Sequence, residues 1–249
     1  TVYLSAPDGE RAVLACRTAA EDGMVVRLSE EGPLAVELEG AERPLPCPPD
    51  GGQTGWGIAC DIGTTTVVCH LVELSTGRTA ATLGEGNAQR SYGGDVMARI
   101  RASMEGQRPA LTAAIRGQLA RMIEALCQNA GVPLTEVRAM AVAANTTMCH
   151  LLAGLAPDSL GAAPFTPLSR FGEEHDAREL ELPFDGTVYI APAVSGYVGG
   201  DITADLLWAQ MDRAERPTLL IDVGTNGEMA LGGAGRLLCC STAAGPAFG

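Results

Sequence analysis

Two short motifs, far apart in the sequence, combine residues that suit phosphate binding. The first reads Asp-Ile-Gly-Thr-Thr-Thr at positions 61–66, and the second reads Asp-Val-Gly-Thr-Asn-Gly at positions 222–227. Glycine lets the backbone approach an anion, successive amide N–H groups attract its charge, and threonine hydroxyls add donors. The aspartate can hold Mg²⁺, usually through water, because this ion keeps much of its hydration shell. Two such turns facing each other would grip the phosphates of a nucleotide from both sides.

The surroundings of the two motifs are also alike. Each motif lies between two apolar runs, and the second run leads to a turn ending in Gly-Arg, at Gly77-Arg78 and Gly235-Arg236. Asp61 and Asp222 are 222 − 61 = 161 residues apart, which excludes a short-period solenoid. The sequence therefore predicts two related β-meanders, over residues 56–83 and 218–242, with the two aspartates at equivalent turns. The remaining alternative is a duplicated hairpin that has lost its ligand.

The composition excludes several classes of protein. The chain has 249 residues, of which 46% are hydrophobic, so it can bury a sizeable core and is not disordered. Its net charge of −13 argues against a nucleic-acid partner. No apolar stretch reaches the about 18–20 residues that a membrane span needs, and residues 1–11 lack the pattern of a signal peptide. We therefore expect a cytoplasmic protein without a membrane partner.

All 17 basic residues are arginine, which narrows the chemistry further. A P-loop and a protein kinase both need a lysine at the phosphates, and Schiff-base catalysis needs one as its nucleophile, so all three are excluded. Any bound phosphate must be held by amides, hydroxyls, Mg²⁺ or arginine. The two glycine–threonine turns meet this requirement.

Between the two motifs, strands and helices alternate in an α/β pattern. We predict helices over 96–103, 110–129, 146–153 and 201–211, and strands over 136–144 and 187–191. Asn145 is in position to cap the third of these helices. Residues 155–187 contain four prolines and little periodicity, so we expect an irregular insertion there. Before the first motif, short strands are predicted around 11–16, 24–28 and 34–38, followed by a proline-rich linker at 44–53.

These parts, in this order, resemble the acetate and sugar kinase/Hsp70/actin (ASKHA) superfamily, in which two ribonuclease-H-like halves each present an Asp-x-Gly-Thr turn to ATP. The chain is more similar still to one branch, the reductive activators of corrinoid proteins, over almost its whole length. The stretches that carry the resemblance are residues 61–66, 87–95, 143–150, 191–201, 221–228 and 240–248. It implies an α/β, ribonuclease-H-like fold in three parts: a ferredoxin remnant with a linker at 1–50, a first subdomain at 51–215 with the insertion at about 155–187, and the start of a second subdomain at 216–249.

The resemblance also implies a function. Such activators use ATP to drive the one-electron reduction of Co(II) to Co(I) in a partner corrinoid protein, a methyltransferase or an iron–sulfur protein, within anaerobic metabolism. The electron comes from a donor through an N-terminal 2Fe–2S domain. We therefore expect ATP and Mg²⁺ as cofactors, with a corrinoid partner and an electron donor for the full-length protein. Whether the protein is a homodimer is left open.

At both ends the sequence departs from this family. Residues 11–18 resemble the strand that carries the last cysteine of the ferredoxin domain, but a 2Fe–2S cluster needs four cysteine ligands, three of them upstream. We expect Cys16 to be an orphan ligand and no cluster to form in this chain. Gly249 follows Gly-Pro-Ala-Phe, where the family usually has an acidic residue. We therefore expect a central fragment that is inactive by itself.

The motifs nominate the residues of the site. Asp61 and Asp222 are expected to hold Mg²⁺ through water, and Asp222, Glu228 and Asp201 are the candidates for catalysis. Asp201 also fits a helix N-cap, and Glu228 also fits a solvated strand residue. A plain structural cap is as good an interpretation of Asn145 as a contact with phosphate. The groups expected to bind the nucleotide belong to Asp61, Gly63, Thr64, Thr65, Thr66, Asn145, Gly224, Thr225, Asn226 and Gly227.

Two other functions stay open from the sequence. One is a small-molecule kinase of the acetate or sugar type, which needs a carboxylate base, and Asp201 is the candidate for it. The other is a nucleotide-free module that binds a partner protein.

Overall fold

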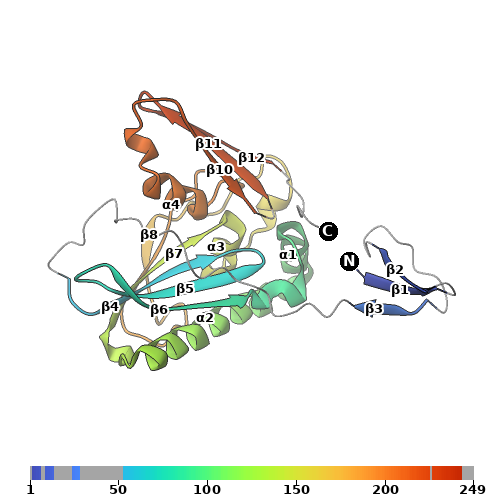
Figure 1. Ribbon diagram of the computed structural model, residues 1–249, viewed down its shortest axis with the longest axis horizontal. Coiled ribbons are helices and arrows are strands. Elements are labelled where there is room, and N and C mark those ends of the chain that lie inside the picture. Colours follow the sequence, from blue (N-terminus) through green and yellow to red (C-terminus); the bar gives the residue numbers. More distant parts are fainter. Residues whose placement is uncertain (1, 7–8, 14–23, 29–52, 225, 243–249) are drawn as a thin grey trace. The chain divides into compact units, whose positions relative to one another are not determined.

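The computed structural model describes residues 2–6, 9–13, 24–28, 53–224 and 226–242 (Figure 1). Cys16, Thr225, the predicted strand at 34–38 and the Gly-Pro-Ala-Phe stretch lie outside the described residues. The chain divides into two compact units. One contains β1 (Val2–Ala6), β2 (Gly9–Val13) and β3 (Val26–Leu28), which pair antiparallel in the order β2-β1-β3. The other unit contains both motifs.

A six-stranded mixed sheet organises the second unit, in the order β6-β5-β4-β7-β9-β8. The antiparallel meander consists of β4 (Trp56–Ile62), β5 (Thr66–Glu73) and β6 (Arg78–Gly86). Strand β4 pairs in parallel with β7 (Val137–Ala144), and β7 pairs in parallel with β9 (Thr187–Ile190). The last strand, β8 (Glu173–Asp176), runs antiparallel to β9 at the edge. This sheet, with its helices, confirms the predicted α/β class.

Helix α2 (Arg108–Ala130) lies along one face of this sheet (Figure 1). Its large apolar residues recur at helical spacing and are fully buried. They share one core with Ile58, Cys60 and Ile62 of β4 and with Val137, Met140, Val142 and Ala144 of β7. Gly131 ends the helix in the left-handed conformation, with φ of 68°. Helix α3 (Thr146–Ala153) packs beside α2, and α4 (Gly200–Trp208) packs against β7. The buried stripe of α2 consists of Leu111, Ile115, Leu119, Met122, Ile123 and Leu126.

Shorter helical segments connect these elements. Helix α1 (Val96–Ala102) starts after its N-cap Asp95, whose carboxylate accepts a hydrogen bond from the Ala98 N–H at 2.7 Å, and it continues into the π-helical η3 (Ser103–Gln107). The 3₁₀ segments are η2 (Ala88–Tyr92), η4 (Leu134–Glu136), η5 (Asp158–Gly161) and η6 (Met211–Arg213). Segment η2 follows β6 directly and leads to α1.

The second motif also lies in an antiparallel meander, formed by β10 (Thr218–Val223), β11 (Gly227–Gly233) and β12 (Arg236–Thr242). The prediction of two meanders is therefore confirmed. Asp61 and Asp222 are each the second-last residue of the first strand. The turns differ in length, because Ile62 pairs with Val67 whereas Val223 pairs with Gly227. The turn of the second motif is thus one residue shorter.

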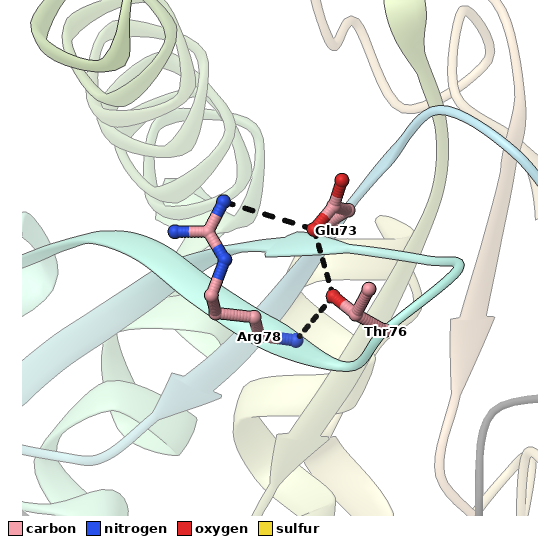
Figure 2. Close-up of polar contacts among 3 residues, drawn as sticks. All are labelled: Glu73, Thr76 and Arg78. Atoms are coloured by element: carbon pink, nitrogen blue, oxygen red, sulfur yellow. Dashed lines mark hydrogen bonds and ion pairs between the residues drawn. The ribbon is translucent and has the colours of Figure 1, made fainter.

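Both meanders contain the predicted Gly-Arg turn. Gly77 and Gly235 have the same positive φ of 72°, a conformation that favours glycine. Figure 2 shows the first of these turns: the Thr76 hydroxyl donates to the Glu73 carboxylate at 2.7 Å and accepts from the Arg78 N–H at 3.2 Å. The Arg78 guanidinium lies 3.7 Å from the same carboxylate. These exposed contacts fix a local bend and contribute little to stability.

The expected irregular insertion at 155–187 contains more structure than the sequence indicates. It includes η5 and strand β8, whose sequence is Glu-Glu-His-Asp. A strand without apolar alternation carries no signal of its own, and pairing with β9 is what defines it. Buried His150 anchors the segment between them, because its Nε2 accepts hydrogen bonds from the N–H groups of Leu168 and Ser169 at 3.1 and 3.4 Å.

The start of α4 gives a test of this packing. A Cβ at Gly199 would lie 2.5 Å from the Asn145 Cα and 2.7 Å from the Thr146 N, which are backbone atoms and have no room to move. We predict that Gly199→Ala lowers the free energy of unfolding by about 2–3 kcal/mol. At Gly117 of α2 a Cβ meets only the end of the Arg121 side chain at 3.8 Å, so Gly117→Ala should raise stability by about 0.5–1 kcal/mol. Urea unfolding of both variants checks this, and equal stabilities would contradict it.

Candidate functional site

The parallel pairing of β4 with β7 creates the edge at which the site lies. Asp61 is in register with Ala143, and Ile62 with Ala144, so both strands end at the same level. The first motif continues from β4, and Asn145 continues from β7. Carboxyl ends of parallel strands are the usual position for ligands in α/β sheets.

One cavity of about 490 Å³ collects most of the nominated residues. It lies between the first motif, the end of β7, helix α4 and the second motif. Gly227 is buried at the start of β11 and does not line this cavity. Thr225 lies outside the described residues. The lining consists of Asp61, Gly63, Thr64, Thr65, Thr66, Ala143, Asn145, Asp201, Ala204, Asp205, Asp222, Gly224, Asn226 and Glu228.

Asn145 has two roles in the structure. Its side-chain oxygen accepts a hydrogen bond from the Met148 N–H at 3.0 Å, which confirms the predicted N-cap of α3. Its side-chain nitrogen donates to the Thr64 hydroxyl at 3.2 Å. The cap thereby ties the amino end of α3 to the turn of the first motif.

The second turn presents Asp222, Gly224 and Asn226 to the cavity. The Gly224 N–H donates to the Asn226 carbonyl at 3.0 Å, which closes the turn. Glu228 pairs with Asp222 across β10 and β11, and its carboxylate accepts a hydrogen bond from the Ser241 hydroxyl at 3.0 Å. Glu228 is half-buried and lines the cavity, so it is not a solvated surface residue.

Helix α4 contributes two carboxylates. The N-cap of this helix is Gly199, so the N-cap interpretation of Asp201 is wrong. The Asp201 carboxylate accepts a hydrogen bond from the Ile202 N–H at 2.8 Å and faces the cavity. Asp205, which belongs to neither motif, lines the cavity as well. Its position four residues after Asp201 places both carboxylates on one face of the helix. This spacing is the feature of the sequence that predicts Asp205 as a site residue.

The carboxylates raise one another's pKa values. Loss of surrounding water is the main cause at each residue, and it raises the pKa of Asp201 to about 7. The Asp61 side chain is open to the cavity, but the cavity walls displace much of its water, and together with the charges of Asp205 and Asp222 this raises its pKa to about 6. The pKa of Asp205 is raised to about 6 in the same way, and those of Asp222 and Glu228 are also raised.

No arginine, lysine or histidine side chain is part of the described lining. Five carboxylates therefore face one another without a basic partner in the cavity wall, and an anion could enter only with a cation. Among the described residues, no group of three or more His, Cys, Asp and Glu side chains is close enough to ligate a metal directly. Oxygen ligands that act through water suit Mg²⁺, so the donor set fits this ion.

The part of the chain that the structure describes contains no helix that is long and apolar enough to cross a membrane.

Comparison with known proteins gives two family matches that adjoin each other. Residues 56–214 match the family model described as the RACo middle region. Residues 216–249 match the model described as the C-terminal domain of RACo, the ASKHA domain.

Individual relatives agree with these matches. The corrinoid activation enzyme RamQ of Eubacterium limosum is 37% identical over 197 residues, which cover 78% of this chain and 33% of the relative. The [Co(II) methylated amine-specific corrinoid protein] reductase of Methanosarcina barkeri is 26% identical over 207 residues, 78% of this chain and 37% of the relative. Among solved structures, a reductive activator for corrinoid, iron-sulfur protein has a TM-score of 0.76 and 41% identity, over 79% of this chain and 32% of that one. The chain spans about a third of the length of each.

The raised pKa values predict how stability depends on pH. A carboxyl group whose pKa is higher in the folded protein than in the unfolded chain binds protons more tightly when folded. Its contribution to stability is present below the unfolded pKa, near 4, and is lost as the pH rises through the folded pKa, about 6 for Asp61 and about 7 for Asp201. Without divalent cations, the melting temperature should therefore fall between pH 5 and pH 7.5, by about 2–4 °C for each kcal/mol lost.

Two variants test the source of this slope. Asp201→Asn removes one of the shifted groups and should make the fall shallower. Asp212→Asn, at an exposed position of η6, is the matched control and should leave it unchanged. Equal slopes in all three proteins would show that the cavity carboxylates do not titrate as described.

Proposed function

The chain belongs to the RACo family, and we propose that it is the nucleotide-binding core of an activator that couples ATP hydrolysis to the one-electron reduction of a corrinoid protein, Co(II) to Co(I). The observation that carries the proposal is that both Asp-x-Gly-Thr turns, from separate meanders, line one cavity. The relatives described as a corrinoid activation enzyme and as a Co(II) corrinoid protein reductase support the reaction. Because the chain spans about a third of their length, the complete activity is proposed for the whole protein.

The turns would bind the phosphates through their backbone and side-chain donors. In the first turn these are the groups of Gly63, Thr64, Thr65 and Thr66, joined by Asn145 at the amino end of α3. In the second turn they are the groups of Gly224, Thr225, Asn226 and Gly227, of which Gly224 and Asn226 line the cavity. Backbone amides can hold an anion without a charged side chain. They can therefore bind the phosphates in a chain that has no lysine for this purpose.

Asp61 and Asp222 would hold Mg²⁺ through water, since each lies near the end of its strand at one of the two turns and both line the cavity. When bound, Mg²⁺ offsets the charge of the phosphates and the carboxylates and stabilises the charge that develops in the transition state. Asp201 and Glu228 would orient the attacking water, and Asp201 can accept a proton near neutral pH because its pKa is about 7. Asp205 adds a further carboxylate on the α4 side.

The coupling of ATP hydrolysis to reduction of the corrinoid protein would depend on the two meanders. A nucleotide held by both turns would favour the arrangement in which the two turns face each other, and its hydrolysis would release that arrangement. The partner would be a corrinoid protein in the cytoplasm, and the electron would come from a donor through a 2Fe–2S domain of the full-length protein. The proposed parts are residues 1–50, 51–215 and 216–249, and Cys16 is proposed to be an orphan ligand in the first of them.

Asp222→Ala in the full-length protein tests the proposal. The variant should hydrolyse ATP on the order of 100-fold more slowly or worse, because it loses electrostatic stabilisation of the transition state. Its free energy of unfolding should change by only roughly 1 kcal/mol, because Asp222 is half-buried at a turn and fills no core position. Thr225→Ala should have a smaller effect on turnover, since neighbouring amides still hold the phosphate. Turnover and melting temperature are measured on the same preparations.

The outcome separates the rival functions. Parental hydrolysis by Asp222→Ala would mean that the second turn is structural, and a protein that binds no nucleotide would be a partner-binding module. Release of ADP that depends on an added metabolite would identify a small-molecule kinase. Nucleotide-dependent formation of Co(I) in a corrinoid protein would support the activator.

A further inference from the structure

The turn of the first motif contacts two buried residues from the segment that follows β6. Asn87 and Arg99, from this segment, are 2% and 0% exposed, respectively. They contact the turn at its carbonyl groups and do not line the cavity on its other side. A guanidinium this deeply buried is unusual, because taking its charge out of water is costly unless the surroundings compensate.

Three successive carbonyl groups of the turn accept hydrogen bonds from these two residues. The Asn87 side-chain nitrogen donates to the Gly63 carbonyl at 2.8 Å, and the Asn87 N–H donates to the Thr65 carbonyl at 2.8 Å. Between them, the Arg99 Nη2 donates to the Thr64 carbonyl. In a trans peptide the C=O and the following N–H point in opposite directions. The peptide N–H groups that follow these carbonyls therefore point away from Asn87 and Arg99.

The two residues are themselves held firmly. The Asn87 side-chain oxygen accepts from the Gln89 N–H at 2.8 Å, and the Arg99 Nε donates to the Gly93 carbonyl at 3.0 Å. The Arg99 Nη1 lies 3.4 Å from the Gln89 side-chain oxygen and 3.0 Å from the Met148 sulfur. Gln89 in turn donates to the Leu111 carbonyl of α2 at 3.0 Å. The turn is thus fixed to the main helix of the sheet.

Arg99 also places a positive charge behind the turn. The four hydrogen-bond partners described for its guanidinium are all uncharged. Loss of water lowers its pKa to about 10, so it remains protonated at neutral pH. Its positive charge lies directly behind a turn whose front lines a cavity with five carboxylates. The described lining contains no basic side chain, and Arg99 provides one on the other side of the turn.

We propose that Asn87 and Arg99, which we call the brace, are positioning residues for the nucleotide site. They hold three successive carbonyls of the first turn on the protein side, so that the turn presents N–H groups to the phosphates, and Arg99 adds a positive charge behind them. This inference rests on the proposed function, because it takes a nucleotide phosphate as the ligand of the turn.

Binding of MgADP to brace variants tests the proposal. Asn87→Asp keeps the shape and the acceptor for Gln89 but removes the donor to Gly63, and Arg99→Met keeps the aliphatic stem without the guanidinium. Each should raise the Kd for MgADP by about 10–100-fold, as expected for a lost hydrogen bond that involves a charged or positioning group. Arg99→Lys retains the charge but not the planar fork, so it should give an intermediate Kd.

The matched control is Arg116→Met. Arg116 also donates to a backbone carbonyl, that of Leu152 at 2.9 Å, but it does so from α2 and away from the turn. This variant loses a hydrogen bond of the same kind, together with the Arg116–Glu181 ion pair at 2.8 Å, and should still keep its Kd within about threefold of the parent. Melting curves of all variants confirm that binding is measured on folded protein. If Arg99→Met does not fold, the Kd values of Asn87→Asp and Arg99→Lys are compared with those of the parent and Arg116→Met. Brace variants that bind MgADP as tightly as the parent would overturn the proposal.

A second measurement separates failure of the brace from failure of the proposed function. If the parent binds no MgADP, the nucleotide assignment is wrong, and the brace is then judged on the nucleotide-free protein alone. With ¹⁵N-threonine labelling, the order parameter of the Thr64 and Thr65 amides should fall from about 0.85 to below about 0.6 in the brace variants and stay unchanged in Arg116→Met. Unchanged order parameters in Asn87→Asp and Arg99→Met would show that the two residues do not position the turn.

Discussion

The candidate site depends on the parallel pairing of β4 with β7. The register of Ile62 with Ala144 brings the first motif and Asn145 to the same end of the sheet. The two paired residues are 144 − 62 = 82 positions apart, because the chain first completes a meander and helix α2. From this edge, Asn145 caps α3 and binds Thr64, and α4 packs on β7 so that Asp201 and Asp205 face the same space. Gly199 permits this approach, because a Cβ at this position would lie only 2.5 Å from the Asn145 Cα.

Electrostatic strain is the second feature of the site. Asp61, Asp201, Asp205, Asp222 and Glu228 share one cavity, and each has a raised pKa. Charges of like sign are retained together when a ligand compensates them, and structural packing alone gives no reason for the arrangement. Under the proposed function, a cation with attached phosphates would supply positive charge in front of the first turn, and Arg99 lies behind that turn. Under that function, the arrangement would couple nucleotide binding to the presence of a divalent ion.

Local signals made much of the fold predictable. The repeated Asp-x-Gly-Thr turns, the spacing of apolar residues in α2 and the cap at Asn145 all act within a few residues of one another, so the sequence shows them directly. Strand β8 was missed because a polar strand is defined by its partner, and the shorter second turn was missed because register follows from pairing. Asp205 shares a helix face with Asp201, so the sequence spacing of four residues is enough to predict it. The contacts of Asn87 and Arg99 span 24 and 35 residues to the turn, and no pattern in a single sequence indicates them.

Under the proposed function, the five carboxylates should allow this cavity to bind a nucleotide only together with a divalent cation. Isothermal titration of ATP into the protein, once with Mg²⁺ and once with EDTA, tests it most directly. The five carboxylates predict that ATP binds in the presence of Mg²⁺ and at least about tenfold more weakly without it, because the phosphates would otherwise meet uncompensated negative charge. Equal affinity in both titrations, or no binding in either, would contradict the account.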